Sequence, residues 1–228
     1  MTKKPITSIG VILDGNRRWA KERGLPSLEG HRRGFENVRA LLEWSREEQI
    51  KTLYIYAFST ENWNRSPEEV SYLMKLFAEA FSGKFVDEAV HNGLKIVFLG
   101  DRTPIAPGLL AEMEKTEERT KEGGVGTLAV CLSYGGRAEI LAGVNKLLAE
   151  GAAPKSEEEF KQALWGANLP DPDLIIRTGG EKRLSGFLAW QSVYSELFFV
   201  DTKWPDFSKE EFLGILEEYH SREQRRGT

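Results

Sequence analysis

The sequence predicts an α/β fold with a mostly parallel central β-sheet flanked by helices, and two observations carry that prediction. Short apolar segments rich in Val, Ile, Tyr and Phe recur along the 228 residues, and a helical pattern separates each from the next. Alternation of strands and helices is typical of a parallel sheet with helices on both faces. The length fits one sizeable domain, so we expect a single domain over residues 1–228.

The expected elements follow from apolar periodicity and from the positions of Gly and Pro. We expect strands at 6–13, 52–58, 94–99, 127–132, 174–176 and 197–200. We expect helices at 17–49 (broken near Gly24–Pro26), 67–91 (with a bend allowed by Gly83), 107–121, 137–150, 156–165, 184–190 and 207–222. Because ligands of such sheets bind beyond the carboxyl ends of the strands, chemistry is expected directly after each strand.

Composition narrows the function classes. Net charge is −4, which argues against general nucleic-acid binding. The single cysteine, Cys131, lies in an apolar run, so we expect neither a disulfide framework nor a cysteine metal site. The apolar runs are too short to span a membrane and Met1–Pro5 does not resemble a signal peptide, which together favour a cytoplasmic setting.

Charge is concentrated at the start of the chain. Residues 1–40 contain nine Lys and Arg but four acidic residues. This excess has two interpretations, a solvated basic face or a site for an anionic ligand.

The segment after the first expected strand favours the second interpretation, a site for an anionic ligand. It reads Asp14-Gly15-Asn16-Arg17-Arg18-Trp19. Gly15 allows close approach of the backbone, Asn16 is a suitable N-cap, and the arginines and free helix amides suit a diphosphate. An aspartate there would repel a bare phosphate, so a cation such as Mg²⁺ is expected between them. An ordinary strand-to-helix turn is the competing interpretation.

Two further segments strengthen the diphosphate interpretation. The run 58–65, FSTENWNR, combines polar side chains with aromatic ones after the second strand. The run 176–185, IRTGGEKRLS, has two glycines that allow a tight turn, so that Arg177 and Arg183 can face one anion. Glu196 follows downstream, and a surface or ion-paired acid is an equally good interpretation of it. Together, these segments fit a substrate pair with two diphosphates and a hard cation.

The chain resembles the undecaprenyl diphosphate synthases, which are cis-prenyltransferases, over essentially its whole length. The resemblance rests on VILDGNRRWAKERGLP, EGHRRG, YAFSTENWNRSPEEVSYLM, SYGGR, PDLIIRTGGEKRLSGFLAWQSVYSELFF and WPDF, which occur in that order. It implies magnesium-dependent addition of isopentenyl diphosphate to an allylic diphosphate such as farnesyl diphosphate. Medium-chain and long-chain products both remain open, with a long product of the undecaprenyl type preferred.

The resemblance also implies a role for each matching residue. Asp14 would bind Mg²⁺ with Glu196 and promote ionisation, and Asn62 is the expected proton acceptor. The allylic diphosphate would be held by Gly15, Asn16, Arg17 and Arg18, supported by Trp19 and His31. The site would further be lined by Ser59, Thr60, Glu61, Trp63 and Arg65, with Glu69 near a mobile loop. Isopentenyl diphosphate would be bound by Arg177, Arg183 and Ser185.

The family is usually homodimeric, and Arg225-Arg226-Gly227 would reach the partner's site. Two positions depart from the family pattern. Ser27 occupies a place where many members have an arginine, and we expect Arg23 or Arg33 to compensate. Ser133 stands where Asn is usual.

The growing product needs a dry tunnel, and a helical stripe can supply its lining. Leu73, Phe77, Phe81 and Phe85 repeat every four residues. Such a stripe is more often ordinary core, but in this family the corresponding helix flanks the tunnel. Two alternatives stay open: a non-catalytic subunit of a heteromeric prenyltransferase, and a phosphohydrolase, against which the missing second aspartate at Asn16 counts. The apolar product makes peripheral membrane contact a further hypothesis.

Overall fold

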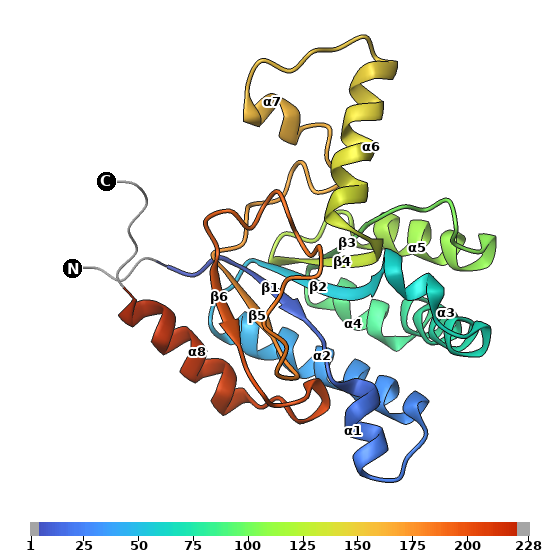
Figure 1. Cartoon of the computed structure of the whole chain (residues 1–228), viewed down its shortest axis with the longest axis vertical. Helices are drawn as coiled ribbons and strands as arrows, with labels where there is room; N and C mark the ends of the chain where they lie inside the picture. Colours follow the sequence, from blue (N-terminus) through green and yellow to red (C-terminus); the bar gives the residue numbers. More distant parts are fainter. Residues whose placement is uncertain (1–4, 223–228) are drawn as a thin grey trace.

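A computed structural model describes residues 5–222 and contains a six-stranded, all-parallel sheet with strand order β3-β4-β2-β1-β5-β6 (Figure 1). The strands are β1 (Ser8–Ile12), β2 (Thr52–Ser59), β3 (Leu94–Leu99), β4 (Gly126–Tyr134), β5 (Leu174–Arg177) and β6 (Glu196–Phe199). The predicted fold class is confirmed.

Eight α-helices and two 3-10 helices lie within the described residues. They are α1 (Asn16–Glu22), α2 (Ser27–Glu47), η1 (Thr60–Asn64), α3 (Pro67–Ser82), α4 (Lys84–His91), α5 (Pro107–Thr120), α6 (Gly136–Ala149), α7 (Glu157–Lys161), η2 (Trp204–Asp206) and α8 (Lys209–Ser221). The predicted break between two helices near Gly24–Pro26 is confirmed.

The sheet is buried on both faces, but the two faces are covered differently. One face packs against α2, α3, α4, α5 and α8 and forms the larger apolar cluster, which includes Val38, Phe81 and Phe212. The other face carries Tyr54, Tyr56 and Cys131, and these pack against Phe187 and Leu188. Helices therefore cover the first face, whereas a turn-rich segment covers much of the second.

Three predicted helices differ in the structure. Residues 184–190 form successive turns in place of a helix, because Ser185, Gly186 and Leu188 have φ values of 51°, 78° and 47°, which a right-handed helix cannot contain. The helix expected at 156–165 is shortened to α7. The helix expected at 67–91 is divided at Gly83, whose φ of −109° and ψ of −161° are extended.

The helices α6 and α7 extend away from the end of the sheet at the top of Figure 1. Within residues 5–222, no helix has both the length and the apolar character that a membrane span requires.

Candidate active site

The carboxyl ends of three neighbouring strands bring the predicted site segments together. Ile12 at the end of β1 is in register with Tyr56 in β2 and with Arg177 in β5. Asp14 and Thr178 follow at the same edge of the sheet, and the Thr178 hydroxyl donates a hydrogen bond to the Asp14 carbonyl at 2.8 Å. The edge predicted to carry chemistry is therefore assembled from β1, β2 and β5.

The turn into α1 depends on Gly15. Its φ is 107°, and a Cβ at this position would lie 2.8 Å from Cβ of Lys203. Gly15, not Asn16, precedes the first helical residue, so the predicted N-cap role of Asn16 is wrong. The side-chain amide of Asn16 instead donates a hydrogen bond to the Leu13 carbonyl at 3.0 Å, which stabilises the turn before α1.

Glycines in the EGHRRG segment bring α2 directly against this turn. A Cβ on Gly30 would lie 2.1 Å from the Asn16 carbonyl oxygen, and one on Gly34 would lie 2.3 Å from Asn16 Oδ1. Any larger side chain would separate the helices. His31, between these glycines, is thereby held close to the Asp14 loop.

Asp14 lies between two arginines. Its carboxylate accepts hydrogen bonds from Arg18 Nη2 at 3.2 Å and from Arg177 Nη2 at 2.9 Å. The Asp14 side chain is 30% exposed, whereas that of Arg177 is 6% exposed. Arg177 is therefore a buried charge that is stabilised by its pairing with Asp14.

Arg177 also fixes the loop that follows β5. Its Nη1 donates to the Arg183 carbonyl and, at 2.9 Å, to Ser185 Oγ. The Arg183 side chain itself is 61% exposed and pairs with Glu181. The structure brings Arg177 and Ser185 together as predicted, while Arg183 contributes its backbone to this contact and its charge to the surface.

A second charged group surrounds His31. Glu69 accepts from Arg65 Nη1 at 2.9 Å, and its other oxygen lies 3.6 Å from Arg17 Nη1. His31 Nε2 is 3.5 Å from Glu69 Oε1. Burial, together with the positive charges of Arg65 and Arg17, lowers the pKa of His31 to about 4 despite Glu69. His31 is thus neutral at neutral pH.

The predicted segment after β2 forms η1. Ser59 N donates to Asn62 Oδ1 at 3.1 Å in a capping box, which orients Asn62. Trp63 Nε1 donates to Ser133 Oγ at 3.0 Å. Ser133, which stands where Asn is usual in the family pattern, has a φ of 53°. Asn tolerates this left-handed conformation better than most residues do.

Thr60 lies against Gly135, where a Cβ would be 2.6 Å from Thr60 Oγ1.

Glu196 and Trp19 lie away from this group. Glu196 is the first residue of β6, in register with Leu174 at the start of β5. It therefore lies at the amino ends of the strands, whereas Asp14 lies beyond their carboxyl ends. Its carboxylate accepts from Arg222 Nη1 at 2.9 Å. The predicted magnesium site shared by Asp14 and Glu196 is therefore not formed within one chain.

Trp19 is buried, and its Nε1 donates a hydrogen bond to Asp206 at 2.7 Å, which supports α1.

Arg23 and Arg33, which were expected to compensate for the missing arginine at position 27, form ion pairs with other residues. Arg23 pairs with Asp206 at 2.8 Å, and Arg33 pairs with Glu36 at 2.7 Å. Neither arginine lines the cavity that contains Ser27, so the structure gives this prediction no support and it stays a prediction. Lys21 lies instead beside Ser27 in a cavity that also includes Arg17 and Arg18, and no described carboxylate pairs with it.

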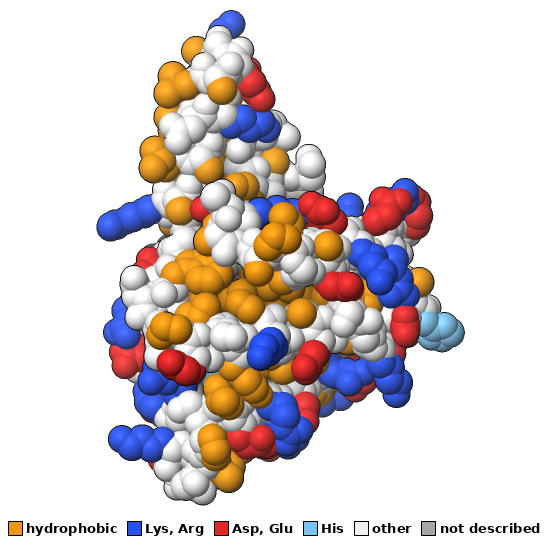
Figure 2. Space-filling view, turned by 90° about the vertical axis from the view of Figure 1, so that its right-hand side faces the viewer, with side chains coloured by type: hydrophobic (Ala, Val, Ile, Leu, Met, Phe, Trp, Pro, Cys, Tyr) orange, Lys and Arg blue, Asp and Glu red, His pale blue; other side chains and the backbone are white. Residues whose placement is uncertain are grey.

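A cavity of about 530 Å³ joins this polar group to an apolar interior. Its polar part is lined by Asp14, Asn16, His31, Ser59, Glu61, Asn62, Arg65, Arg177 and Ser185, and its apolar part by Phe35, Val38, Ile55, Leu73, Leu76, Phe77, Phe81, Phe85, Leu128 and Val130. All four residues of the predicted helical stripe line it. In Figure 2, hydrophobic side chains gather across the middle of the face that looks toward the right of Figure 1, with charged side chains around them.

The sequence analysis missed several lining residues. Phe35 and Val38 face the cavity from α2, and their helical spacing next to Gly34 is a signal that could have identified them. Tyr56 hydroxyl lies 3.2 Å from the Ser185 carbonyl, and Trp204 N donates to the Asp14 carbonyl at 2.9 Å. No local pattern in the sequence connects these pairs.

Among residues 5–222, no cluster of three or more His, Cys, Asp or Glu side chains is placed to hold a metal ion. Asp14 is nonetheless a hard oxygen donor at a solvent-accessible position. Mg²⁺ is commonly bound by one or two carboxylates together with substrate phosphates, so this donor fits it.

The fold and the cavity define an α/β protein whose site is charged at one end and apolar at the other, and comparisons with known proteins identify its family. The model of the prenyltransferase family described as undecaprenyl diphosphate synthase matches residues 12–227. The chain belongs to this family, and it is an enzyme that transfers prenyl groups.

Similar proteins span nearly the whole chain. An isoprenyl transferase of Thermotoga maritima is 44% identical over 96% of this chain and 95% of its own. A tritrans,polycis-undecaprenyl-diphosphate synthase (geranylgeranyl-diphosphate specific) of Thermoplasma volcanium is 42% identical over 96% and 88%. Lavandulyl diphosphate synthase from Lavandula x intermedia, solved with dimethylallyl diphosphate, has a TM-score of 0.93 at 30% identity and covers 98% of this chain and 99% of its own.

Proposed function

We propose that the whole chain acts as one cis-prenyltransferase unit that adds isopentenyl diphosphate units to an allylic diphosphate, and that the product is a long polyprenyl diphosphate. The single observation that carries this proposal is the continuous cavity, which has arginines and Asp14 at one end and the Phe77–Phe81 stripe at the other. A substrate with a charged head and an apolar tail matches both ends.

The polar end divides into two diphosphate sites. Arg17, Arg18 and Lys21, with the Gly15–Asn16 backbone, would bind the allylic diphosphate in the cavity beside His31. Arg177, Arg183 and Ser185 would bind isopentenyl diphosphate, with Arg177 also bonded to Asp14. This arrangement would hold the two reacting carbons close together.

The chemistry requires stabilisation of charge that grows on the leaving diphosphate. Arg18 would stabilise this charge on the allylic diphosphate, while Arg177 holds the Asp14 carboxylate in place beside it. Mg²⁺, held by Asp14 and the substrate phosphates, would neutralise further negative charge when it is bound. Asn62, oriented by the Ser59 amide, would accept the proton that the condensed product loses.

The apolar end favours elongation. Each buried methylene contributes about 0.8 kcal/mol, so each five-carbon unit that enters the cavity contributes roughly 3–4 kcal/mol. Farnesyl diphosphate is the proposed starter. A homodimer remains a proposal carried by the family resemblance. A cytoplasmic location remains a proposal carried by the composition, and peripheral membrane contact is a proposal that follows from the apolar product. Arg225-Arg226-Gly227 lies outside the described residues.

The test is a product assay with labelled isopentenyl diphosphate and farnesyl diphosphate, with and without Mg²⁺. We expect magnesium-dependent polyprenyl diphosphate, and nuclear magnetic resonance spectra of the dephosphorylated product should show cis geometry in the added units. Absence of product with farnesyl, geranyl and geranylgeranyl diphosphate would instead support a non-catalytic subunit. Release of phosphate without carbon–carbon bond formation would support a phosphohydrolase.

A further inference from the structure

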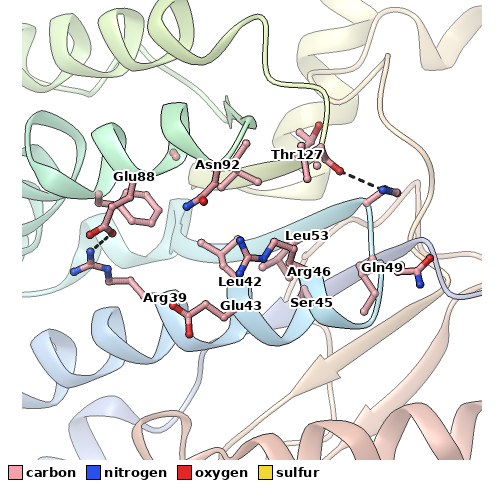
Figure 3. Close-up of a pocket in the computed structure, with 17 residues that line it drawn as sticks. Arg39, Leu42, Glu43, Ser45, Arg46, Gln49, Leu53, Glu88, Asn92 and Thr127 are labelled. Atoms are coloured by element: carbon pink, nitrogen blue, oxygen red, sulfur yellow. Dashed lines mark hydrogen bonds and ion pairs between the residues drawn. The ribbon is translucent and has the colours of Figure 1, made fainter.

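The pairing of β2 with β4 changes between the two ends of the sheet. At the amino ends it is regular, and residues 52–56 pair in order with residues 127–131. Figure 3 shows this regular end, where Thr127 lines a pocket together with residues of α2 and α4. At the carboxyl ends the register skips one residue on each strand, Ala57 in β2 and Ser133 in β4. Each is the extra residue of a β-bulge, and bulges near functional sites commonly redirect side chains.

The two bulges change which face of the sheet receives the side chains that follow them. Side chains alternate along a strand, so Phe58 would share a face with Tyr56 if Ala57 were paired regularly. It packs instead in the larger apolar cluster, on the face that borders the main cavity. Tyr134 and Cys131 would likewise lie on opposite faces, but both belong to the second cluster. The carboxyl ends of β2 and β4 are therefore rearranged beside the site while the strands stay paired.

Ser133 has the less common backbone conformation of the two extra residues. Its φ of 53° is left-handed, which residues other than Gly, Asn and Asp rarely adopt, and it is 1% exposed. Its carbonyl accepts a hydrogen bond from Asp101 N, after β3, at 3.1 Å. Its hydroxyl accepts from Trp63 Nε1 at 3.0 Å. Ser133 thus connects the ends of β3 and β4 to η1.

Trp63 is held from both bulged strands. Its ring packs edge to face on Phe58 of β2, with centroids 4.9 Å apart and an interplanar angle of 71°, and its Nε1 reaches Ser133 of β4. Asn62 directly precedes it in η1, and Asn62 Oδ1 accepts from Ser59 N at 3.1 Å. A 3-10 helix has poorer internal hydrogen bonds than an α-helix, so the position of this five-residue element depends on such outside contacts.

We propose that Ser133 is a positioning residue, which fixes η1 through its hydrogen bond with Trp63 and thereby orients Asn62 toward the proton that is removed. Ser133 does not line the main cavity, so it acts through Trp63 and not on the substrate. This inference rests on the proposed function, because it names what orients the proton acceptor of that reaction.

The first test removes the hydroxyl and keeps the Cβ. With enzyme in excess over farnesyl diphosphate, Ser133→Ala should slow the first condensation by up to about tenfold, since one hydrogen bond is lost. The half-saturating concentration of isopentenyl diphosphate should stay unchanged. Ser8→Ala is the matched control, because Ser8 is also 1% exposed and its Oγ has no hydrogen-bond partner among residues 5–222.

An isotope effect separates positioning from a loss of folded protein. With isopentenyl diphosphate deuterated at C2, the carbon that loses the proton, the isotope effect on the first condensation should be larger in Ser133→Ala than in the unaltered chain. A smaller fraction of folded enzyme would lower the rate and leave the isotope effect unchanged. Circular dichroism checks that each variant is folded. Ser133→Gly suits the left-handed backbone and should show the same loss, so the test does not depend on the stability of Ser133→Ala.

A double-mutant cycle tests whether Ser133 acts through Trp63. Trp63→Phe keeps a ring beside Phe58 but lacks the donor, so adding Ser133→Ala to it should cause no further loss of rate. Losses that multiply would overturn the inference, as would a Ser133→Ala rate equal to that of Ser8→Ala or an unchanged isotope effect. Lack of any polyprenyl product from the unaltered chain would instead overturn the proposed function, so the two failures are distinguishable.

Discussion

At the polar end of the cavity, Asp14 is held by directional contacts, whereas at the apolar end Phe81 is held by packing. The Asp14 carbonyl accepts from Thr178 and Trp204, and its carboxylate accepts from two arginines. Phe81 contacts Phe98 and Phe77 ring to ring, with centroids 4.6 Å and 6.3 Å away. The polar end therefore specifies positions of charge, while the apolar end supplies buried area.

This difference implies that substitutions at the two ends change different quantities. Loss of a charge at the polar end should lower turnover, because the charged groups act on the reacting atoms. Loss of volume at the apolar end should lower the free energy of unfolding, because the side chains there belong to the main core.

The largest effect is expected at Asp14. Asp14→Asn keeps the shape but removes the charge that pairs with Arg177 and Arg18, so turnover should fall by roughly 10²–10³-fold. Steady-state assays at saturating Mg²⁺ measure this. Asp87→Asn is the control, because Asp87 pairs with Arg119 at the surface. Turnover of Asp14→Asn within threefold of the unaltered chain would contradict the role given to Asp14.

The next effect tests the apolar end. Leu73 is 4% exposed, so Leu73→Ala should lower the free energy of unfolding by about 2–5 kcal/mol. Urea titration followed by fluorescence measures it. Leu148→Ala makes the same change at a residue that is 72% exposed, and should cost less than about 0.5 kcal/mol. Equal losses in the two variants would show that Leu73 does not belong to the core.

The third prediction concerns pH. The pKa of His31 is lowered from 6.5 to about 4, so folding favours its neutral form. Its contribution to the free energy of unfolding is fully present above pH 6.5 and is lost as the pH falls toward 4, on the order of 3 kcal/mol in total. Unfolding titrations between pH 4 and 7.5 should show this loss, and His31→Gln should reduce it. An unchanged slope in His31→Gln would assign the pH dependence to other groups.

The smallest effect is expected at Lys21. Lys21→Gln removes a solvent-exposed charge from the allylic site, so the KM for the allylic diphosphate should rise several-fold, and the rise should shrink at high salt. Arg33→Ala is the control, because Arg33 pairs with Glu36. A similar rise in Arg33→Ala would indicate a general effect of surface charge in place of a contact with Lys21.

Much of the fold could be predicted from the sequence, because its strands are apolar and its helices are periodic. The failures have local causes. Residues 184–190 have a composition typical of a helix, but the backbone at Ser185 and Leu188 is left-handed, which excludes one. The side chains of Ser185 and Leu188 give no indication of that conformation. The extended break at Gly83 was foreseen as a bend, since glycine indicates where a helix can change direction but not by how much.

The site shows a similar division. Segments that follow strands were placed correctly, because the ends of parallel strands must meet at one edge. Pairings between side chains of distant loops could not be predicted, because they depend on the register between neighbouring strands. Glu196 was assigned to the Asp14 site although it begins its strand, and Arg23 was expected at a phosphate although Asp206 already pairs with it.

The position of β1 between β2 and β5 has a consequence for how the protein is made. Asp14 is synthesised early, yet its partners Arg177, Thr178 and Trp204 lie more than 160 residues later. A nascent chain can pair β1 with β2 and pack α2 against the Asp14 loop, but Arg177, Thr178 and Trp204 are absent from that loop until most of the chain has left the ribosome. The complete set of contacts around Asp14 is thus acquired late in the synthesis of this chain.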